Sequence, residues 1–142
     1  MSGSKCANDI RSAVEALNRG DMSGYLRHFG TPSVRWVDGI DEPFSLDFVG
    51  ESLSQLLSAF EGLHLAEELL FGNDRYVCAH WRMTGRHVGE YFSLPPTGRD
   101  IDVRLCEVYE FDGGRVSTTW THGDPGVLFR QIEGSANSER PQ

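Results

Sequence analysis

Three polar residues in the C-terminal third of the chain could carry acid/base chemistry: Glu107, His122 and Asp124. Carboxylates and imidazoles transfer protons efficiently when their surroundings bring the pKa close to the working pH. Glu107 stands in an otherwise apolar stretch, where a carboxylate needs a partner such as His122, Arg104 or a ligand. We therefore take Glu107, His122 and Asp124 as the candidate catalytic residues.

A tight turn at Gly113-Gly114 would place these residues on one hairpin. Side chains alternate between the two faces of a sheet, so directly paired residues share a face. A loop one residue longer than Gly113-Gly114 would exchange the two faces. With the two-residue loop, one face is expected to hold the pairs Phe111–Val116, Tyr109–Thr118, Glu107–Trp120, Leu105–His122 and Val103–Asp124.

Asp124 has two interpretations that the sequence leaves open. At the mouth or floor of a cavity, beside Trp120, it would lose water contacts, and its pKa would rise toward neutrality. Alternatively, Asp124-Pro125 opens a final helix, with the carboxylate capping free backbone amides. A capping residue can still face a pocket, so the two roles are compatible. His122 has its own alternative, an exposed histidine at the end of a strand.

Aromatic residues supply the walls that a small-molecule pocket needs. Tyr25 and Phe29, on a short helix, are expected to close the cavity from the helical side. His80 and Trp81 are neighbours on one strand and face opposite sides of it, and the strand alone does not tell which side is inward. The expected substrate-binding residues are Tyr25, Phe29, Trp36, His80, Trp81, Tyr109 and Trp120.

The composition excludes several classes of protein. With 21 Asp plus Glu against 13 Lys plus Arg, the net charge is −8; this charge repels nucleic-acid phosphates, and no basic cluster offsets it. No apolar run approaches the roughly 20 residues that cross a bilayer, and residues 1–5 do not lead into a signal peptide. We expect a cytoplasmic domain that binds a small molecule, and neither nucleic acid nor a membrane.

Three dispersed cysteines, Cys6, Cys78 and Cys106, predict neither a disulfide framework nor a zinc motif. Cys78, His80 and His87 come closest to a ligand set, but their spacing matches no common metal motif. The glycine motifs that bind phosphates or dinucleotides do not occur in the sequence. We therefore expect no metal and no cofactor.

Periodicity predicts the elements that must position these residues. Apolar residues at helical spacing predict a helix that ends at Gly20, a short helix over 22–29 and a helix over 50–60. A strand over 33–38 lies between the last two. The later part of the chain predicts strands over 64–71, 75–85, 87–93, 99–111 and 115–122, and a short helix that ends at Ile132.

Helices followed by antiparallel strands predict an α+β domain. Such a sheet buries one face by curling around the N-terminal helices, and a sheet that curls so far encloses a hollow able to hold a ligand. We expect one domain over residues 1–133 and a flexible polar tail over 134–142.

Several short motifs stand between Trp81 and Asp124: TGRHVGEY at 84–91, LPPTGR at 94–99, EVYEF at 107–111, GRV at 114–116, Trp120 and Asp124. With these motifs the chain resembles the SnoaL-like polyketide cyclases, members of the nuclear transport factor 2-like superfamily of cone-shaped α+β barrels. In the N-terminal half, LNRGD at 17–21 and the order of elements also agree. The resemblance implies a curved mixed or antiparallel sheet wrapped around N-terminal helices.

The resemblance also implies a chemistry. Cyclases of this family close the last ring of an aromatic polyketide by intramolecular aldol condensation, without metal or cofactor. Asp124 stands at the position of the family's general acid/base, and His122, Tyr109 or Tyr25 could donate a hydrogen bond to the enolate. A homodimer is implied as well, for which the second face of the sheet offers a surface.

We therefore predict a cofactor-free enzyme of natural-product biosynthesis, such as antibiotic biosynthesis, that forms an enolate of a polycyclic or polyketide substrate in a hydrophobic cavity. Aldol cyclisation is the first hypothesis. Two alternatives stay open: a cofactor-free hydroxylase, in which the substrate carbanion itself reduces oxygen, and a binding protein without activity that holds a reactive metabolite.

Overall fold

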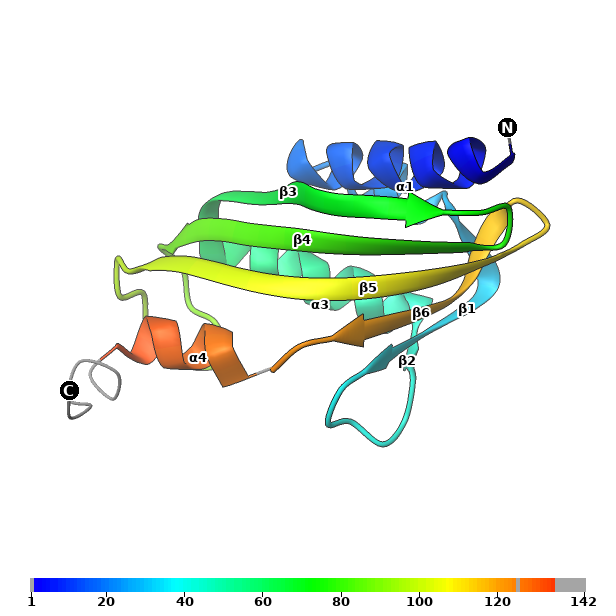
Figure 1. Ribbon diagram of the computed structural model, residues 1–142. Helices are drawn as coiled ribbons and strands as arrows, with labels where there is room; N and C mark the ends of the chain where they lie inside the picture. The colour runs from blue at the N-terminus through cyan, green and yellow to red at the C-terminus, as the bar shows by residue number, and fades with distance from the viewer. Residues whose placement is uncertain (1, 125, 135–142) are drawn as a thin grey trace.

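Helices frame a set of six strands in the computed structural model, which describes residues 2–124 and 126–134 (Figure 1). Within these residues, no helix has both the length and the apolar character needed to span a bilayer. The tail expected over 134–142 lies, apart from Gly134, outside the described residues. The helices are α1 (Ser2–Asn18), α2 (Met22–Leu26), α3 (Leu46–Ala59) and α4 (Gly126–Glu133). The strands are β1 (Phe29–Val37), β2 (Phe44–Ser45), β3 (Phe60–Gly72), β4 (Tyr76–His87), β5 (Asp100–Asp112) and β6 (Arg115–His122).

The helices form where the sequence supplies an apolar stripe and caps. In α1, Ile10, Val14 and Leu17 are buried at helical spacing, and Gly20 adopts the left-handed φ of 79° that ends the helix. The side chain of Ser45 accepts a hydrogen bond from the third residue of α3. Because of this cap, α3 begins four residues earlier than the periodicity predicted.

The strands form one mixed sheet in the order β2-β1-β6-β5-β4-β3. β1 and β6 pair in parallel, and the other neighbours pair antiparallel. The sheet is open, with β2 and β3 as its edges. α1 lies along β3 and β4, and α3 packs on β1 and β3 (Figure 1). The predicted α+β architecture is therefore confirmed, as an open sheet packed against helices.

The core lies between the sheet and these helices. We call the face of the sheet that packs on the helices the inner face; on β4 it carries Val77, Ala79 and Trp81, all buried. The opposite, outer face carries Cys78 and His80 on the same strand. The direction of Trp81 and His80, which the sequence left open, is thus inward for Trp81 and outward for His80.

The strand predicted over 87–93 is wrong. β4 continues through His87, and the chain then leaves the sheet as a loop. Phe92 and Ser93 adopt left-handed φ angles of 46° and 69°, which are incompatible with a strand. The loop stays close to the sheet because Nδ1 of His87 lies 3.0 Å from the hydroxyl of Thr97.

The predicted hairpin register is correct next to the turn and wrong beyond it. Gly113 and Gly114 form the two-residue loop, with φ angles of 63° and 83°. Phe111 pairs with Val116, as predicted. The register then shifts by one residue, because Ser117 is an extra residue in β6 that forms a β-bulge.

Because of this bulge, the side chains of β6 beyond Ser117 lie on the faces opposite to those that the predicted register gave them. Trp120 and His122, predicted to face inward, lie on the outer face, opposite Val108 and Cys106. Thr119 and Thr121 take their place on the inner face. The pairs that share the inner face are Tyr109–Thr119 and Glu107–Thr121.

Deletion of Ser117 tests whether it is the extra residue of β6. The deletion removes the bulge and leaves Phe111–Val116 and Glu110–Thr118 as consecutive pairs, so Trp120 and His122 stay on the outer face; we expect the free energy of unfolding to change by no more than about 1 kcal/mol. Ser117→Ala is the control, since it keeps the bulge and loses only the 3.2 Å hydrogen bond to the Glu110 carbonyl, worth about 1 kcal/mol. Denaturant unfolding measures both, and a loss of at least about 3 kcal/mol in the deletion variant alone would contradict the expectation.

Candidate functional site

Buried polar side chains gather on the inner face around Glu107, which is 6% exposed. The Glu107 carboxylate accepts hydrogen bonds from the hydroxyl of Tyr109 and, at 2.8 Å, from the hydroxyl of Thr121. The Trp81 indole in turn donates to the Tyr109 oxygen at 3.0 Å. Three neighbouring strands, β4, β5 and β6, therefore each supply a partner, because alternation brings these four side chains to the same face.

The counter-ion of Glu107 is Arg35, from β1. A guanidinium nitrogen of Arg35 lies 3.8 Å from a Glu107 oxygen, and the two side chains are 12% and 8% exposed. Arg35 also donates to the Tyr25 hydroxyl at 2.6 Å. The parallel pairing of β1 with β6 sets Arg35 beside Thr119 on the inner face. This pair explains how a carboxylate is accommodated in the core, where an unpaired charge would be destabilising.

Burial determines the protonation of the groups around this ion pair. It raises the pKa of the Tyr109 hydroxyl well above its ordinary value, and the charge of Glu107 adds to the effect. Burial also raises the pKa of Tyr25. For Arg35, burial alone would lower the pKa, but the oxygens of Tyr25 and Glu107 outweigh it and raise the pKa. Both phenols therefore stay neutral, and the guanidinium stays charged.

A narrow cleft between β1 and α3 borders this group. Its empty space totals about 160 Å³, but no part of it admits a sphere the size of water. The hollow that the curled sheet was expected to enclose is instead filled here, because Tyr25, Phe29, Trp81 and Tyr109 pack into one core. The cleft is lined by Phe29, Ser33, Val34, Arg35, Leu46, Val49 and Thr119.

Three of these lining residues are polar, and one of them is unpaired. The Ser33 hydroxyl donates to the Val116 carbonyl at 3.0 Å, and Arg35 is paired as described. The Thr119 hydroxyl is buried, on a residue that is 1% exposed, and has no hydrogen-bond partner among the described residues. Buried polar groups are nearly always paired, so Thr119 and Arg35 together offer a hydroxyl and a cation to a molecule that enters the cleft.

Asp124 lies apart from this group, at the start of α4. Its side chain is 57% exposed and forms an ion pair with Arg130. The amide of Gly126, the first residue of α4, donates to it at 2.9 Å. The hydrogen bond from Arg130 and that from the Gly126 amide lower the pKa of Asp124. The predicted rise of this pKa is therefore wrong, and the contacts are those of the helix-capping alternative.

The structure does not bring His122 to Glu107 either. His122 lies on the outer face, 49% exposed, with Nδ1 at 3.0 Å from an oxygen of Asp38. Trp120 and Trp36 pair with each other on the same outer face, so their predicted place as cavity walls is wrong. Exposed His80 also points outward. The predicted site residues that do gather around Glu107 are Tyr25, Phe29, Trp81 and Tyr109.

Sequence reasoning missed Arg35, Thr119 and Thr121. In the strand over 33–38, the apolar side chain of Trp36 suggested that Trp36 faces inward. The pairing with β6 instead turns its neighbour Arg35 inward. Glu107 itself was the available signal, because a carboxylate in an apolar strand requires a cation on a neighbouring strand. The two threonines were missed because the bulge is not apparent in the sequence.

Comparison with known proteins agrees with this fold. The model of the SnoaL-like polyketide cyclase family matches residues 8–132. The chain belongs to this family. Among curated proteins, no match was found.

Solved structures share the fold of this SnoaL-like chain at low sequence identity. AclR, a proposed hydroxylase from Streptomyces galilaeus, is 24% identical over 89% of this chain and 94% of its own, with a TM-score of 0.81. IdmH, a proposed polyketide cyclase from Streptomyces antibioticus, is 19% identical over 89% of this chain and 96% of its own, with a TM-score of 0.75. A proposed polyketide cyclase from Xanthomonas campestris pv. campestris is 14% identical over 93% of this chain and 99% of its own, with a TM-score of 0.81.

Replacement of Thr119 by Val tests whether its hydroxyl is unpaired. Val keeps the shape of the side chain and removes a buried hydroxyl that has no partner, so we expect the protein to gain about 1 kcal/mol of unfolding free energy. Denaturant unfolding of the wild type and of Thr119→Val measures the change. Thr121→Val is the matched control, since its hydroxyl does bond to Glu107; it should be destabilised by a similar amount. A loss of stability in Thr119→Val would mean that its hydroxyl is paired.

Proposed function

We propose that this chain is a cofactor-independent enzyme that forms an enolate of a polyketide-type substrate, for an aldol cyclisation or a related step, with Glu107 as the acid/base. The observation that carries the proposal is the buried pair of Glu107 and Arg35. This pair lies beside the cleft with the Thr119 hydroxyl, which has no hydrogen-bond partner in the part of the chain that the structure describes. Membership of the SnoaL-like polyketide cyclase family supports the substrate class. Asp124, exposed and paired with Arg130, is not the base in this proposal.

The proposed reaction needs one proton acceptor and one site for negative charge. Glu107 takes a proton from the carbon that lies between two substrate carbonyls, and the electron pair moves onto a carbonyl oxygen. Arg35 and the Thr119 hydroxyl stabilise this enolate oxygen. The enolate carbon then forms a bond to a second carbonyl of the same molecule, and the proton on Glu107 returns to the alkoxide that results.

The groups around Glu107 suit it to this exchange. Tyr109 and Thr121 hold the carboxylate in a fixed orientation through hydrogen bonds to its two oxygens. Such fixed placement of reacting groups contributes much of the rate in an intramolecular condensation. In this proposal, the substrate enters the cleft by displacing Leu46 and Val49 of α3, which line it opposite β1.

Replacement of Glu107 by Gln tests the proposed base. The test substrate is an aromatic polyketide whose side chain carries a methylene between two carbonyls, and cyclisation is followed by chromatography. Removal of the proton acceptor should lower kcat by at least about a hundredfold. Because Arg35 loses its counter-ion, stability should also fall, by about 3 kcal/mol, so turnover is measured where the variant remains folded. Thr119→Val, which folds without that penalty, should lower kcat by about tenfold or more.

The variant Asp124→Asn tests the alternative base, Asp124, which the family resemblance implies. If Asp124→Asn abolishes turnover while Glu107→Gln retains it, the proposed base is wrong. An oxygen electrode distinguishes the reaction types: uptake of oxygen during turnover would favour the hydroxylase over the cyclase. Tight binding of the substrate without conversion by the wild type would favour the binding protein.

We also propose that the chain forms a homodimer through the outer face of its sheet. Four large apolar side chains on this face are strongly exposed: Trp36 at 38%, Leu69 at 49%, Phe71 at 56% and Tyr76 at 41%. A second copy can cover them by two-fold pairing of the same patch. We expect sedimentation velocity to give the mass of two chains for the wild type and of one chain for Phe71→Asp. A single-chain mass for the wild type would contradict the dimer.

A further inference from the structure

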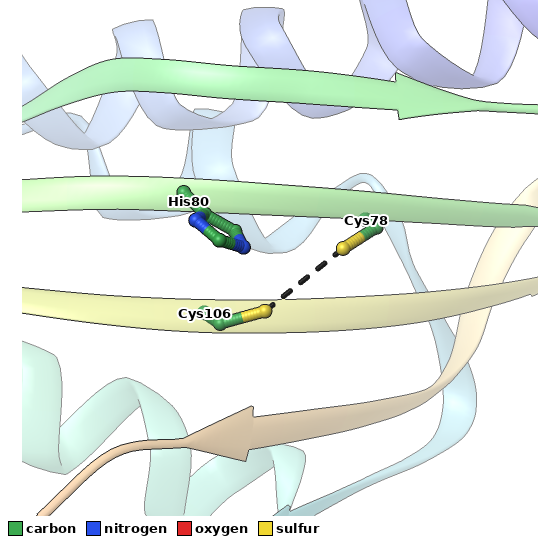
Figure 2. Close-up of side chains that lie close together, drawn as sticks. All are labelled: Cys78, His80 and Cys106. Carbon is green, nitrogen blue, oxygen red and sulfur yellow. Dashed lines mark hydrogen bonds between the residues drawn. The ribbon is translucent and has the colours of Figure 1, made fainter.

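Three side chains able to bind a metal meet on the outer face of the sheet, at β4 and β5 (Figure 2). They are Cys78, His80 and Cys106, and their ligand atoms all lie within 4.8 Å of one another. Antiparallel pairing sets Cys106 directly opposite His80, and Cys78 lies two residues before His80 on the same face. His87, grouped with Cys78 and His80 from spacing alone, is instead buried on the inner side and contacts Thr97.

We propose that Cys78, His80 and Cys106 bind a zinc ion, through two thiolates and one imidazole, with the fourth position left to water or another ligand. Two cysteines and one histidine with an open fourth position are an established zinc ligand set. Thiolate and imidazole ligands favour zinc over hard cations such as magnesium and calcium.

The separation of the two sulfurs fits an ion better than it fits a disulfide. The Sγ atoms of Cys78 and Cys106 lie 3.9 Å apart. Two thiolates at about 2.3 Å from a tetrahedral zinc ion are about 3.8 Å apart. A disulfide requires Cα atoms within about 6.8 Å, whereas diagonal neighbours such as these two cysteines are typically about 7–8 Å apart.

The surroundings leave the site open to a cation. Among the described residues, the exposed His80 ring has no hydrogen bond or ion pair, so its nitrogens are free to bind. The next pair along this face, Arg82 and Arg104, does not repel an ion strongly, because each is neutralised by a carboxylate. The pairs are Arg82–Asp102 at 2.6 Å and Arg104–Glu68 at 3.2 Å.

The zinc site is separate from the acid/base group proposed around Glu107. Cys106 and Glu107 are consecutive on β5, so their side chains project to opposite faces of the sheet. An ion at the outer face therefore contacts no member of the Glu107 group. All three ligands come from one chain, so binding does not require the homodimer. The site lies within the outer-face patch proposed for that dimer, because Cys78 and His80 stand opposite Phe71 and Leu69.

The test uses the full chain, reduced and stripped of metal by a chelator, with zinc alone as the probe. We expect the wild type to retain one zinc per chain after desalting. Cobalt should give the thiolate charge-transfer and strong visible bands of a tetrahedral site. Cys78→Ser, Cys106→Ser and His80→Ala should each weaken zinc binding by more than about tenfold, since even outer partners of a metal contribute that much. Circular dichroism checks that each variant folds.

Two matched controls lie outside the cluster. Cys6→Ser removes the thiol on α1, and His64→Ala removes another exposed histidine of the outer face; both should bind zinc like the wild type. No zinc retained by the reduced wild type would overturn the proposal. Equal affinity in His80→Ala would also overturn it, as would a loss of binding in Cys6→Ser that the cluster variants do not show.

Discussion

The buried ion pair between Glu107 and Arg35 is the interaction on which the inner face depends. Removing one partner of such a pair typically costs about 3–5 kcal/mol, because the other charge is left uncompensated in the core. Hydrogen bonds from Tyr109 and Thr121 complete the shell of the carboxylate, and the Tyr25 hydroxyl accepts from the guanidinium. A shift of β1 or β5 by one residue would turn one of the two charges to the outer face. The pair therefore constrains how these strands are aligned as well as what the site can do.

The architecture could be predicted from the sequence because it depends on patterns that many residues share. Alternation along β4 and β5 and the glycines of the 113–114 turn predicted the central hairpins, and the apolar stripe of α1 predicted the helix that covers them. The site could not be predicted to the same extent, because it depends on which face of the sheet each side chain occupies. A single extra residue in a strand turns all the following side chains to the other face. Ser117 adds one residue to β6, which placed His122 and Trp120 on the wrong face. Trp36 was misplaced because its apolar side chain favoured the inward face, whereas the pairing of β1 with β6 turns Arg35 inward instead.

The contrast between Glu107 and Asp124 shows how environment separates two carboxylates with the same intrinsic chemistry. Asp124 is exposed and holds Arg130 and the first amide of α4, contacts that favour its charged form and lower its pKa. Glu107 lies in the core, where its ion pair and hydrogen bonds are sheltered from water and are therefore stronger than they would be at the surface. The resemblance to the SnoaL-like cyclases pointed to the first of these positions, whereas the packing of this chain gathers polar groups around the second. Membership of a family defines the fold more firmly than it assigns the role of a single side chain.

The strand β5 joins these observations, because its two faces have different chemistry. Its odd-numbered residues, among them Glu107 and Tyr109, enter the core, and the even-numbered Cys106 and Val108 form part of the outer face. On the inner face, a cation and hydroxyls surround a carboxylate, which suits proton transfer. On the outer face, two thiols and an imidazole converge without a charged residue among them, which suits a thiophilic ion. Because consecutive residues of one strand serve the two sites, the bulge in β6 acts on both: it turns Thr121 toward Glu107 and places His122, rather than Thr121, opposite Cys106.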